Sequence, residues 1–416
     1  TVTTRDAWST TPSARVQSQT ASVGVDERNV MGTGREAAAF VTSNRGQVGV
    51  GVAVRDPFLA VGGGELSLAA GLSAYRDGRD AAVTLENRRR SAFDPRHIEG
   101  TLRRSTRGEF DATADIVRRD RAAFLGGWAV HPSARGVTSL LAGVEGERTT
   151  LIAAEGAAIV GPARVDRDFA GLDVGVRREA ASYDTVTWLM PAHALVDVPL
   201  GFETEAIVGG GHDFERGQPA LHVDLWGGRV WNPDRRHLIV ADLWTSGYWG
   251  DDRLDAASVR GELSLFRAAR RGLWIAHLAG ERLINPDPDV RALASSDPTL
   301  AALPHDSRLA RGAIAGSLER DIRIRALSRS WALDGALFGA ASTRWAPAVP
   351  LNDELYVGVL GAGLRVAPLR PARGTFRIDA GYPVTRSREL RRAPFLAISV
   401  TPWLGADRVR DGRKGR

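Results

Sequence analysis

The chain has 416 residues, a formal net charge of +6 and no cysteine, so disulfide bonds and thiolate metal sites are excluded. No run of eighteen or more apolar residues occurs, which excludes transmembrane helices. The arginines are spread over many segments and form no compact basic helix, which argues against nucleic-acid binding.

Almost every positive charge is an arginine, because Lys414 is the only lysine. Two explanations are open. A GC-rich genome would place arginine wherever a cation is tolerated, whereas a functional explanation is a positively charged lumen or a contact with anionic lipid.

The first clear element lies at residues 46–56, where four valines alternate with small or polar residues. Side chains of a strand point alternately to opposite faces, so this pattern predicts a strand with one apolar face. A soluble sheet would turn that face to its core, and a membrane barrel would turn it to lipid. One strand does not decide between the two.

The same alternation recurs at residues 221–231, 318–326 and 376–384, and there the second face carries charge. A closed sheet in a bilayer turns its apolar face to lipid and its polar face to a wet lumen. This favours an all-β fold, a transmembrane antiparallel β-barrel formed by residues 1–416 as one domain, over a soluble β-sandwich. Tryptophans and tyrosines near strand ends suit the two membrane interfaces.

We count eighteen to twenty candidate strands, and those between residues 92 and 210 are either long strands protruding from the membrane or hairpins in external loops. Residues 285–316 contain repeated Asp-Pro pairs and are predicted to form a long loop. Residues 404–416 form a basic C-terminal tail. Thr1 follows no charged and apolar leader, so we expect any signal peptide to have been removed or never included.

Two groups of motifs resemble one known family. Near the start, residues 26–35 read DERNVMGTGR, similar to the D-N-x-x-G-T-G turn of barrels in the BamA/TamA outer-membrane assembly superfamily, the bacterial surface antigen family. Toward the end, the family's order of motifs is reproduced by RGA at 311–313, GAGLR at 361–365 and FRIDAGYP at 376–383. The residues that mark the early turn and the strand after it are Asn29, Gly32, Thr33, Gly34, Asp56 and Pro57.

The resemblance implies a barrel of sixteen strands, more not being excluded, in the bacterial outer membrane. It also implies a loop arginine that folds into the lumen, which is Arg311 here, with Gly312 permitting a tight turn. The family's wall aspartate falls at Ala340, so the candidate partners of this latch are Glu319, Asp334 and Asp379.

The family's function is the insertion or translocation of client proteins through a lateral seam between the first and last strands. Here the first strand of the seam is expected at residues 1–10 or 14–26. The closing strand, at residues 394–403, contains Pro394, Phe395 and Trp403, and its prolines remove ladder donors. Implied partners are the lipid bilayer, client outer-membrane or secreted proteins, and POTRA-type periplasmic domains that this chain lacks. The alternative is a passive pore, or a barrel that anchors a separate periplasmic domain.

No enzymatic motif is found. The eight histidines show no metal-ligand spacing, no G-x-S-x-G segment occurs, and the glycine-rich turns lack a dinucleotide fingerprint. We therefore expect no catalytic residue, no metal and no cofactor. His222 and Asp224 share a strand face and are interpreted as a polar pair facing the lumen.

Overall fold

A computed structural model describes the chain over the following residues: 10–17, 20–27, 29–44, 47–61, 64–75, 78–87, 96–108, 116–133, 136–152, 166–180, 182–186, 188–189, 196–250, 253–285, 311–326, 331–345, 356–368, 375–385 and 394–401. These residues form strands, their turns and one short 3-10 helix, η1 (Val30–Gly32). None of them belongs to a helix of the length and apolarity that a membrane crossing needs.

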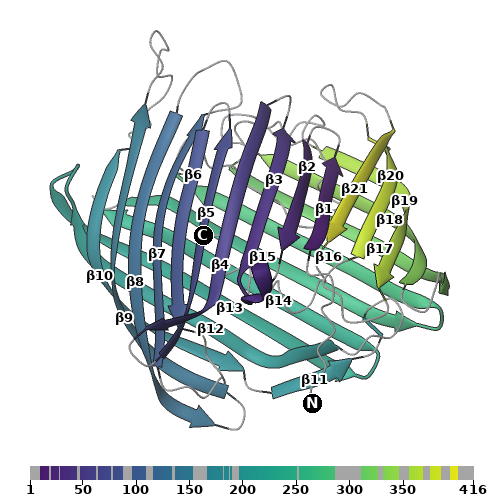
Figure 1. Cartoon of the computed structure of the whole chain (residues 1–416), viewed down its shortest axis with the longest axis horizontal. Helices are drawn as coiled ribbons and strands as arrows, with labels where there is room; N and C mark the ends of the chain where they lie inside the picture. Colours follow the sequence, from purple (N-terminus) through teal and green to yellow (C-terminus); the bar gives the residue numbers. More distant parts are fainter. Residues whose placement is uncertain are drawn as a thin grey trace.

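The first ten strands follow one another around the front of the molecule in Figure 1. Their bounds are β1 Thr10–Gln17, β2 Thr20–Glu27, β3 Glu36–Asn44, β4 Gln47–Val61, β5 Gly64–Tyr75, β6 Gly78–Asn87, β7 Arg96–Gly108, β8 Ile116–Ser133, β9 Gly136–Ile152 and β10 Arg167–Ala180.

The remaining strands continue the sheet through the back wall to the C-terminal end (Figure 1). Their bounds are β11 Ser182–Val186, β12 Val196–Asp213, β13 Gln218–Asp234, β14 His237–Gly250, β15 Arg253–Ala269, β16 Gly272–Ile284, β17 Gly312–Ala326, β18 Trp331–Trp345, β19 Tyr356–Pro368, β20 Thr375–Pro383 and β21 Phe395–Thr401.

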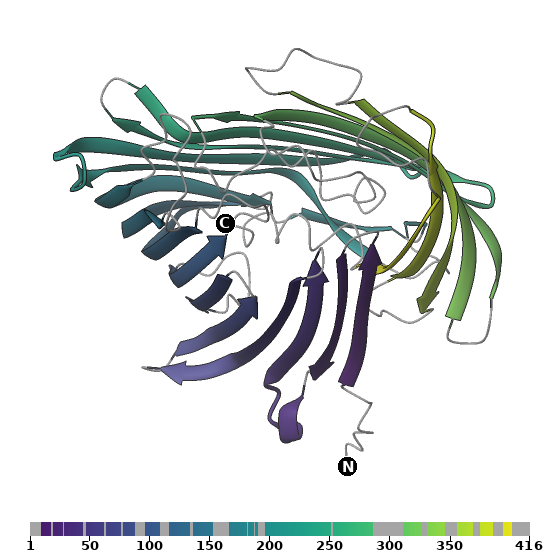
Figure 2. The same cartoon turned by 90° about the horizontal axis from the view of Figure 1, so that it is seen from above.

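All of these strands belong to one antiparallel sheet in which chain neighbours pair. β10 and β11 both pair with β12 along different parts of its length, so the 21 strands of the described residues occupy 20 positions around the sheet. The sheet rolls up until β1 meets β21 at the pair Val16 and Ile398 (Figure 2). The all-β antiparallel prediction is confirmed, and the number of strands exceeds the expected sixteen, a possibility that the prediction left open.

Of the two alternatives for residues 92–210, the described residues show long strands. β8 and β12 each have 18 residues and β9 has 17, whereas a tilted strand needs about 9–11 to cross a bilayer.

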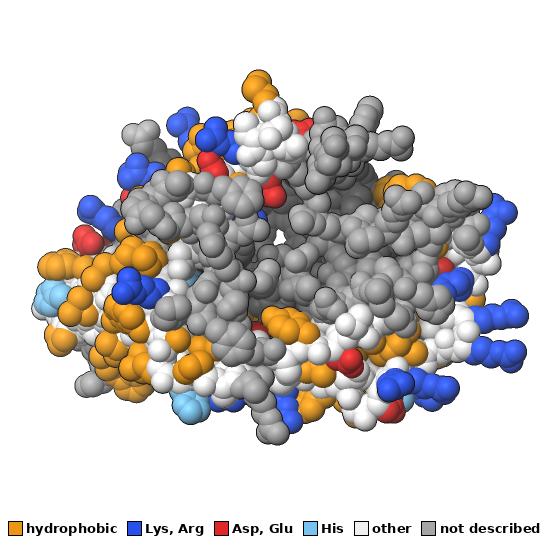
Figure 3. Space-filling model, turned by 60° about the horizontal axis from the view of Figure 1, so that its bottom comes forward, with side chains coloured by type: hydrophobic (Ala, Val, Ile, Leu, Met, Phe, Trp, Pro, Cys, Tyr) orange, Lys and Arg blue, Asp and Glu red, His pale blue; other side chains and the backbone are white. Residues whose placement is uncertain are grey.

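The two faces of the sheet have opposite chemistry. Val48, Val50, Val52 and Val54 on β4 are 52 to 59% exposed, and aliphatic or aromatic residues of most other strands are exposed in the same way. Figure 3 shows hydrophobic side chains gathered on the outer flank of the molecule. The inner face instead buries charged residues, among them Glu145, His222, Glu319, Arg365 and Asp379. This is the reverse of a soluble sandwich, whose apolar faces would be buried.

One end of the inner face carries an apolar cluster. Val230, Leu238, Phe266 and Leu273, from β13 to β16, pack there with Val186, Leu189 and Val198. The segment 188–189 therefore lies against the inside of the wall at this end.

The predicted loop at residues 285–316 ends earlier in the chain than expected. β17 already begins at Gly312, and residues 312–316 pair with both β16 and β18. Residues 286–310 and the tail at 404–416 lie outside the described residues.

Candidate functional site

The predicted family-marker turn between β2 and β3 is held by its own side chains. Asn29 Oδ1 accepts a hydrogen bond from the Gly34 amide at 2.7 Å, and the Thr33 hydroxyl donates to the Val30 carbonyl at 2.7 Å. Gly32 and Gly34 have φ of +74° and +73°, a backbone region that glycine adopts without steric cost. These four residue types are thus explained by the local geometry, and the turn presents Met31 almost fully to the outside, at 97% exposure.

Asp56, the marker residue on the following hairpin, contacts the end of this turn. Arg35 Nε donates to Asp56 Oδ2 at 2.9 Å. The register between β4 and β5 shifts between Asp56 and Leu59, so Pro57 lies in a β-bulge, one of the few sheet positions where proline is tolerated. The structure therefore brings the two halves of the early motif together.

The predicted latch residues are placed differently from expectation. Arg311 is exposed at the start of β17 and makes no ion pair with a described residue; its carbonyl accepts a hydrogen bond from the Leu283 amide. Gly312 is a regular ladder position paired with Arg282 and Trp345, so it provides no tight turn. The role of Arg311 as a latch stays a prediction, because most of the preceding loop lies outside the described residues.

Two of the three predicted latch partners are instead held by arginines of the wall. Glu319 on β17 accepts hydrogen bonds from Arg365 Nε and Nη2 at 3.1 and 2.9 Å, and from Arg377 Nη2 at 2.9 Å. Arg365 also donates to Asp379, and all four residues are buried. We call Glu319, Arg365, Arg377 and Asp379 the C-terminal ion network.

Asp334, the third candidate partner, is also buried on the inner face. It lies beside Arg323 of the neighbouring strand, with Oδ1 and Nε 3.8 Å apart. Two acidic candidates are thus brought together in one network and the third is separate from it.

The predicted seam is located between β1 and β21. These strands share the single residue pair Val16 and Ile398, whereas β1 and β2 share eight pairs and β20 and β21 share seven. Pro394 is exposed just before β21, Phe395 is the first residue of that strand, and Trp403 lies outside the described residues. The first strand of the seam was expected at residues 1–10 or 14–26. In the structure β1, at Thr10–Gln17, is the strand that meets β21, and residues 1–9 lie outside the described residues.

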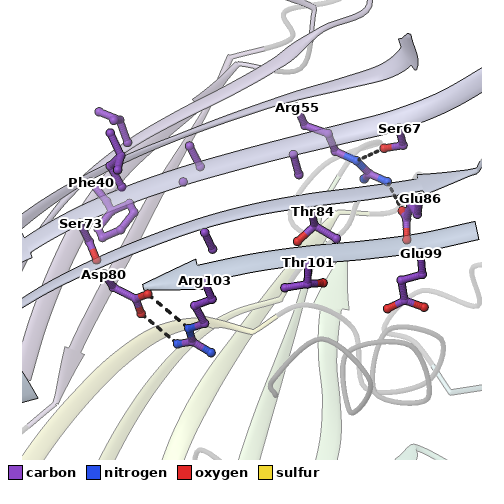
Figure 4. Close-up of a pocket in the computed structure, with 16 residues that line it drawn as sticks. Phe40, Arg55, Ser67, Ser73, Asp80, Thr84, Glu86, Glu99, Thr101 and Arg103 are labelled. Atoms are coloured by element: carbon purple, nitrogen blue, oxygen red, sulfur yellow. Dashed lines mark hydrogen bonds and ion pairs between the residues drawn. The ribbon is translucent and has the colours of Figure 1, made fainter. Parts of the chain in front are cut away.

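The inner wall of β3 to β7 borders a cavity of about 440 Å³. Figure 4 shows its polar lining: Arg55 reaches Ser67 and Glu86, and Arg103 reaches Asp80 through both carboxylate oxygens. The cavity therefore offers both signs of charge to whatever occupies it.

Sequence reasoning missed a second buried cluster, which joins distant strands. On β9, Glu145 lies 3.2 Å from His222 of β13, and Glu147 accepts a hydrogen bond of 3.1 Å from Tyr248 of β14. We call these four residues, with Arg121, Arg167, Asp173 and Asp224, the cross-wall cluster. His222 and Asp224 do share a buried inner face, as expected, but spacing along the chain gave no signal for their partners on β9 and β10.

The cross-wall cluster requires a sharp bend in the sheet. Going from β9 to β13 takes three strand spacings, about 14 Å in a flat sheet, yet the side chains of Glu145 and His222 touch. Stacking of His222 on Tyr248, with ring centroids 4.7 Å apart, extends the contact to β14. The cluster thus fixes the strongly curved part of the wall.

No family model and no curated protein matches this chain. Among solved structures, BamA from Haemophilus ducreyi lacking POTRA domains 1–3 has a TM-score of 0.35 and 11% identity, over 95% of this chain and 71% of that chain. CdiB from Acinetobacter baumannii has a TM-score of 0.40 and 9% identity, over 94% of this chain and 58% of that chain.

The siderophore receptor PirA from Pseudomonas aeruginosa is similar at a TM-score of 0.42 and 13% identity, over 94% of this chain and 79% of that one. The chain spans less than two thirds of the length of CdiB. Likeness at these scores assigns no family, so membership of the BamA/TamA superfamily stays a prediction from the motifs.

Proposed function

We propose that this chain is an integral β-barrel of the bacterial outer membrane that inserts or translocates client proteins through the seam between β1 and β21. The outward apolar face and inward charged face support the membrane location, because only a closed sheet satisfies its backbone groups in lipid. In this proposal the chain acts without enzymatic activity, as a barrel of the BamA/TamA type.

The single observation that carries the function is the one-pair seam. An incompletely paired strand edge is a template for a further strand, so a client strand can add to β1 or β21 by β-augmentation. Client proteins and POTRA-type periplasmic domains are the partners that this role requires.

Locking the seam tests the proposal. The chain has no cysteine, so Val16→Cys with Ile398→Cys introduces only the two intended thiols. Directly paired residues of antiparallel strands have Cα atoms about 4.5–5.5 Å apart, within the range of a disulfide. The measurement is the rate at which proteoliposomes containing the variant insert an unfolded β-barrel client.

We expect the oxidised variant to lose most of its insertion rate and to recover it on reduction. The matched control, Val23→Cys with Val41→Cys, locks two fully paired strands and should retain the native rate. Equal rates for the oxidised and reduced seam variant would contradict the proposal.

The second candidate function is a passive pore, or a barrel that anchors a separate domain. The charged cavity along β3 to β7 favours it, because a pore needs a wet, polar inner wall. Conductance across planar bilayers separates the two: a large and steady current indicates a pore, and small flickering current indicates an obstructed barrel.

A further inference from the structure

The strongest unexplained site lies within the cross-wall cluster. Glu145 of β9, Asp173 of β10 and His222 of β13 are all buried on the inner face, and one ligating atom from each lies within 4.8 Å of the other two. One imidazole and two carboxylates form a donor set that suits first-row divalent cations.

We propose that Glu145, Asp173 and His222 bind a divalent transition-metal cation of the Zn²⁺ class, which braces β9 and β10 against β13. This site is independent of the seam and of the proposed function.

The orientation of His222 supports a metal site. Its Nδ1 lies 3.2 Å from Glu145 Oε2, and its Nε2 lies 3.6 Å from Asp224 Oδ2. Two ligands of a tetrahedral zinc ion, each about 2.0–2.2 Å from the metal, are roughly 3.4 Å apart. The first distance is therefore close to that of a ligand pair. Asp224 lies just beyond hydrogen-bond distance of the other imidazole nitrogen, on the side from which a carboxylate would orient a metal-bound imidazole.

Asp173 supplies the second, independent observation. It is 6% exposed, and its Oδ1 has no hydrogen-bond partner among the residues that the structure describes. A buried carboxylate oxygen that accepts no hydrogen bond is costly, and a bound cation would remove that cost. Two other carboxylates of the cluster have arginine partners. Arg121 lies 2.8 Å from Glu145 Oε1, which leaves Oε2 beside His222, and Arg167 lies 2.6 Å from Glu147 Oε1.

The ladder explains how Asp173 and His222 face one another. Gly209 of β12 lies between them, paired with Asp173 on one side and with His222 on the other. A Cβ on Gly209 would stand 2.3 Å from Asp173 Oδ1. The absence of a side chain at this one position therefore leaves the space in which the carboxylate and the imidazole converge.

Cobalt(II) is a suitable probe because its visible absorption reports coordination. We would titrate Co²⁺ into the EDTA-treated protein, folded in detergent micelles, and then displace it with Zn²⁺. The expected result is one Co²⁺ per chain. The Asp173→Asn and His222→Asn variants should lose this binding, and Asp224→Asn should weaken it about 10–100-fold, as removal of an orienting partner does.

The matched control is His277→Asn. His277 is also a buried histidine of the inner wall, hydrogen-bonded to Ser264 at 2.9 Å and remote from the cluster in sequence. This variant should bind Co²⁺ like the native chain. Absence of stoichiometric Co²⁺ binding, or equal binding by the native chain and His222→Asn, would overturn the proposal.

A measurement on the native chain covers the case in which the ligand variants do not fold. One equivalent of Zn²⁺ should raise its unfolding temperature, because a ligand that binds only the folded state stabilises that state. Gly209→Ala should abolish the rise by filling the space beside Asp173. An unfolding temperature that Zn²⁺ leaves unchanged would contradict the site.

Discussion

At the scale of single residues, the inner wall is organised by arginines placed between carboxylates. Arg365 is the clearest case, because it is 3% exposed and donates to both Glu319 and Asp379. A fixed guanidinium plane on β19 satisfies two carboxylates at once, one from β17 and one from β20, which lysine does not do in the same geometry. Such contacts allow the wall to bury charge and still remain tightly paired.

Removal of Arg365 should be strongly destabilising. Arg365→Ala leaves Glu319 and Asp379 buried with less compensation, and breaking a buried pair in this way costs about 3–5 kcal/mol. The measurement is the free energy of unfolding by urea in detergent. Arg148→Ala is the control, because Arg148 is 66% exposed and lies 3.8 Å from Asp168; it should cost less than about 1 kcal/mol. Equal effects of the two substitutions would refute this account of the network.

The marker turn gives a second test at this scale. Gly34 has φ of +73°, a conformation that costs an L-residue roughly 1–2 kcal/mol, with asparagine least affected. Gly34→Val should therefore reduce the free energy of unfolding by about that amount, and Gly34→Asn by less. If both variants are as stable as the native chain, the turn is not held in this conformation.

At the scale of elements, each strand separates two environments. On β4, Val52 is 52% exposed on the outer face, and its neighbour Ala53 lies on the opposite face, the face from which Arg55 enters the cavity. Val52→Lys should destabilise the protein by about 2–4 kcal/mol in a bilayer, whereas Ala53→Lys enters a polar cavity and should cost much less. Unfolding in lipid vesicles measures both. A larger loss for Ala53→Lys would show that the faces are assigned the wrong way round.

Much of this element structure could be predicted from the sequence. Alternation of valines at residues 48–54, and of apolar and charged residues at 376–384, depends only on the two-residue period of a strand. The five C-terminal strands, β17 to β21, follow the predicted order of motifs. Whether the apolar face of a strand contacts a protein core or lipid could be decided only from many strands considered together. In the structure this apolar face points outward.

The remaining features depend on contacts that alternation does not encode. Glu145 and His222 lie 77 positions apart and meet only because the sheet bends between β9 and β13. The strand number depends on how many long hairpins the rolled sheet accommodates, which a resemblance to a sixteen-stranded family does not determine. Gly312 was expected in a turn, but pairing with β16 and β18 places it inside a strand.

At the scale of the whole molecule, the sheet is continuous except where its ends meet. Neighbouring strands around the wall share long ladders, such as thirteen residue pairs between β12 and β13, whereas β1 and β21 share one. The cross-wall cluster lies on β8 to β14, away from this junction, whereas the C-terminal ion network reaches β20, the strand paired with β21. The molecule therefore combines a braced wall with one weakly paired seam, which is what lateral opening requires.

The most direct test of this arrangement is hydrogen–deuterium exchange of the backbone amides in a lipid bilayer. We predict that amides of β1 and β21 exchange at least about tenfold faster than those at the centre of β13, because local opening is easiest where pairing is least complete. The oxidised Val16→Cys, Ile398→Cys variant should remove most of this difference. Equal protection of β1, β21 and β13 in the native chain would contradict a seam that opens.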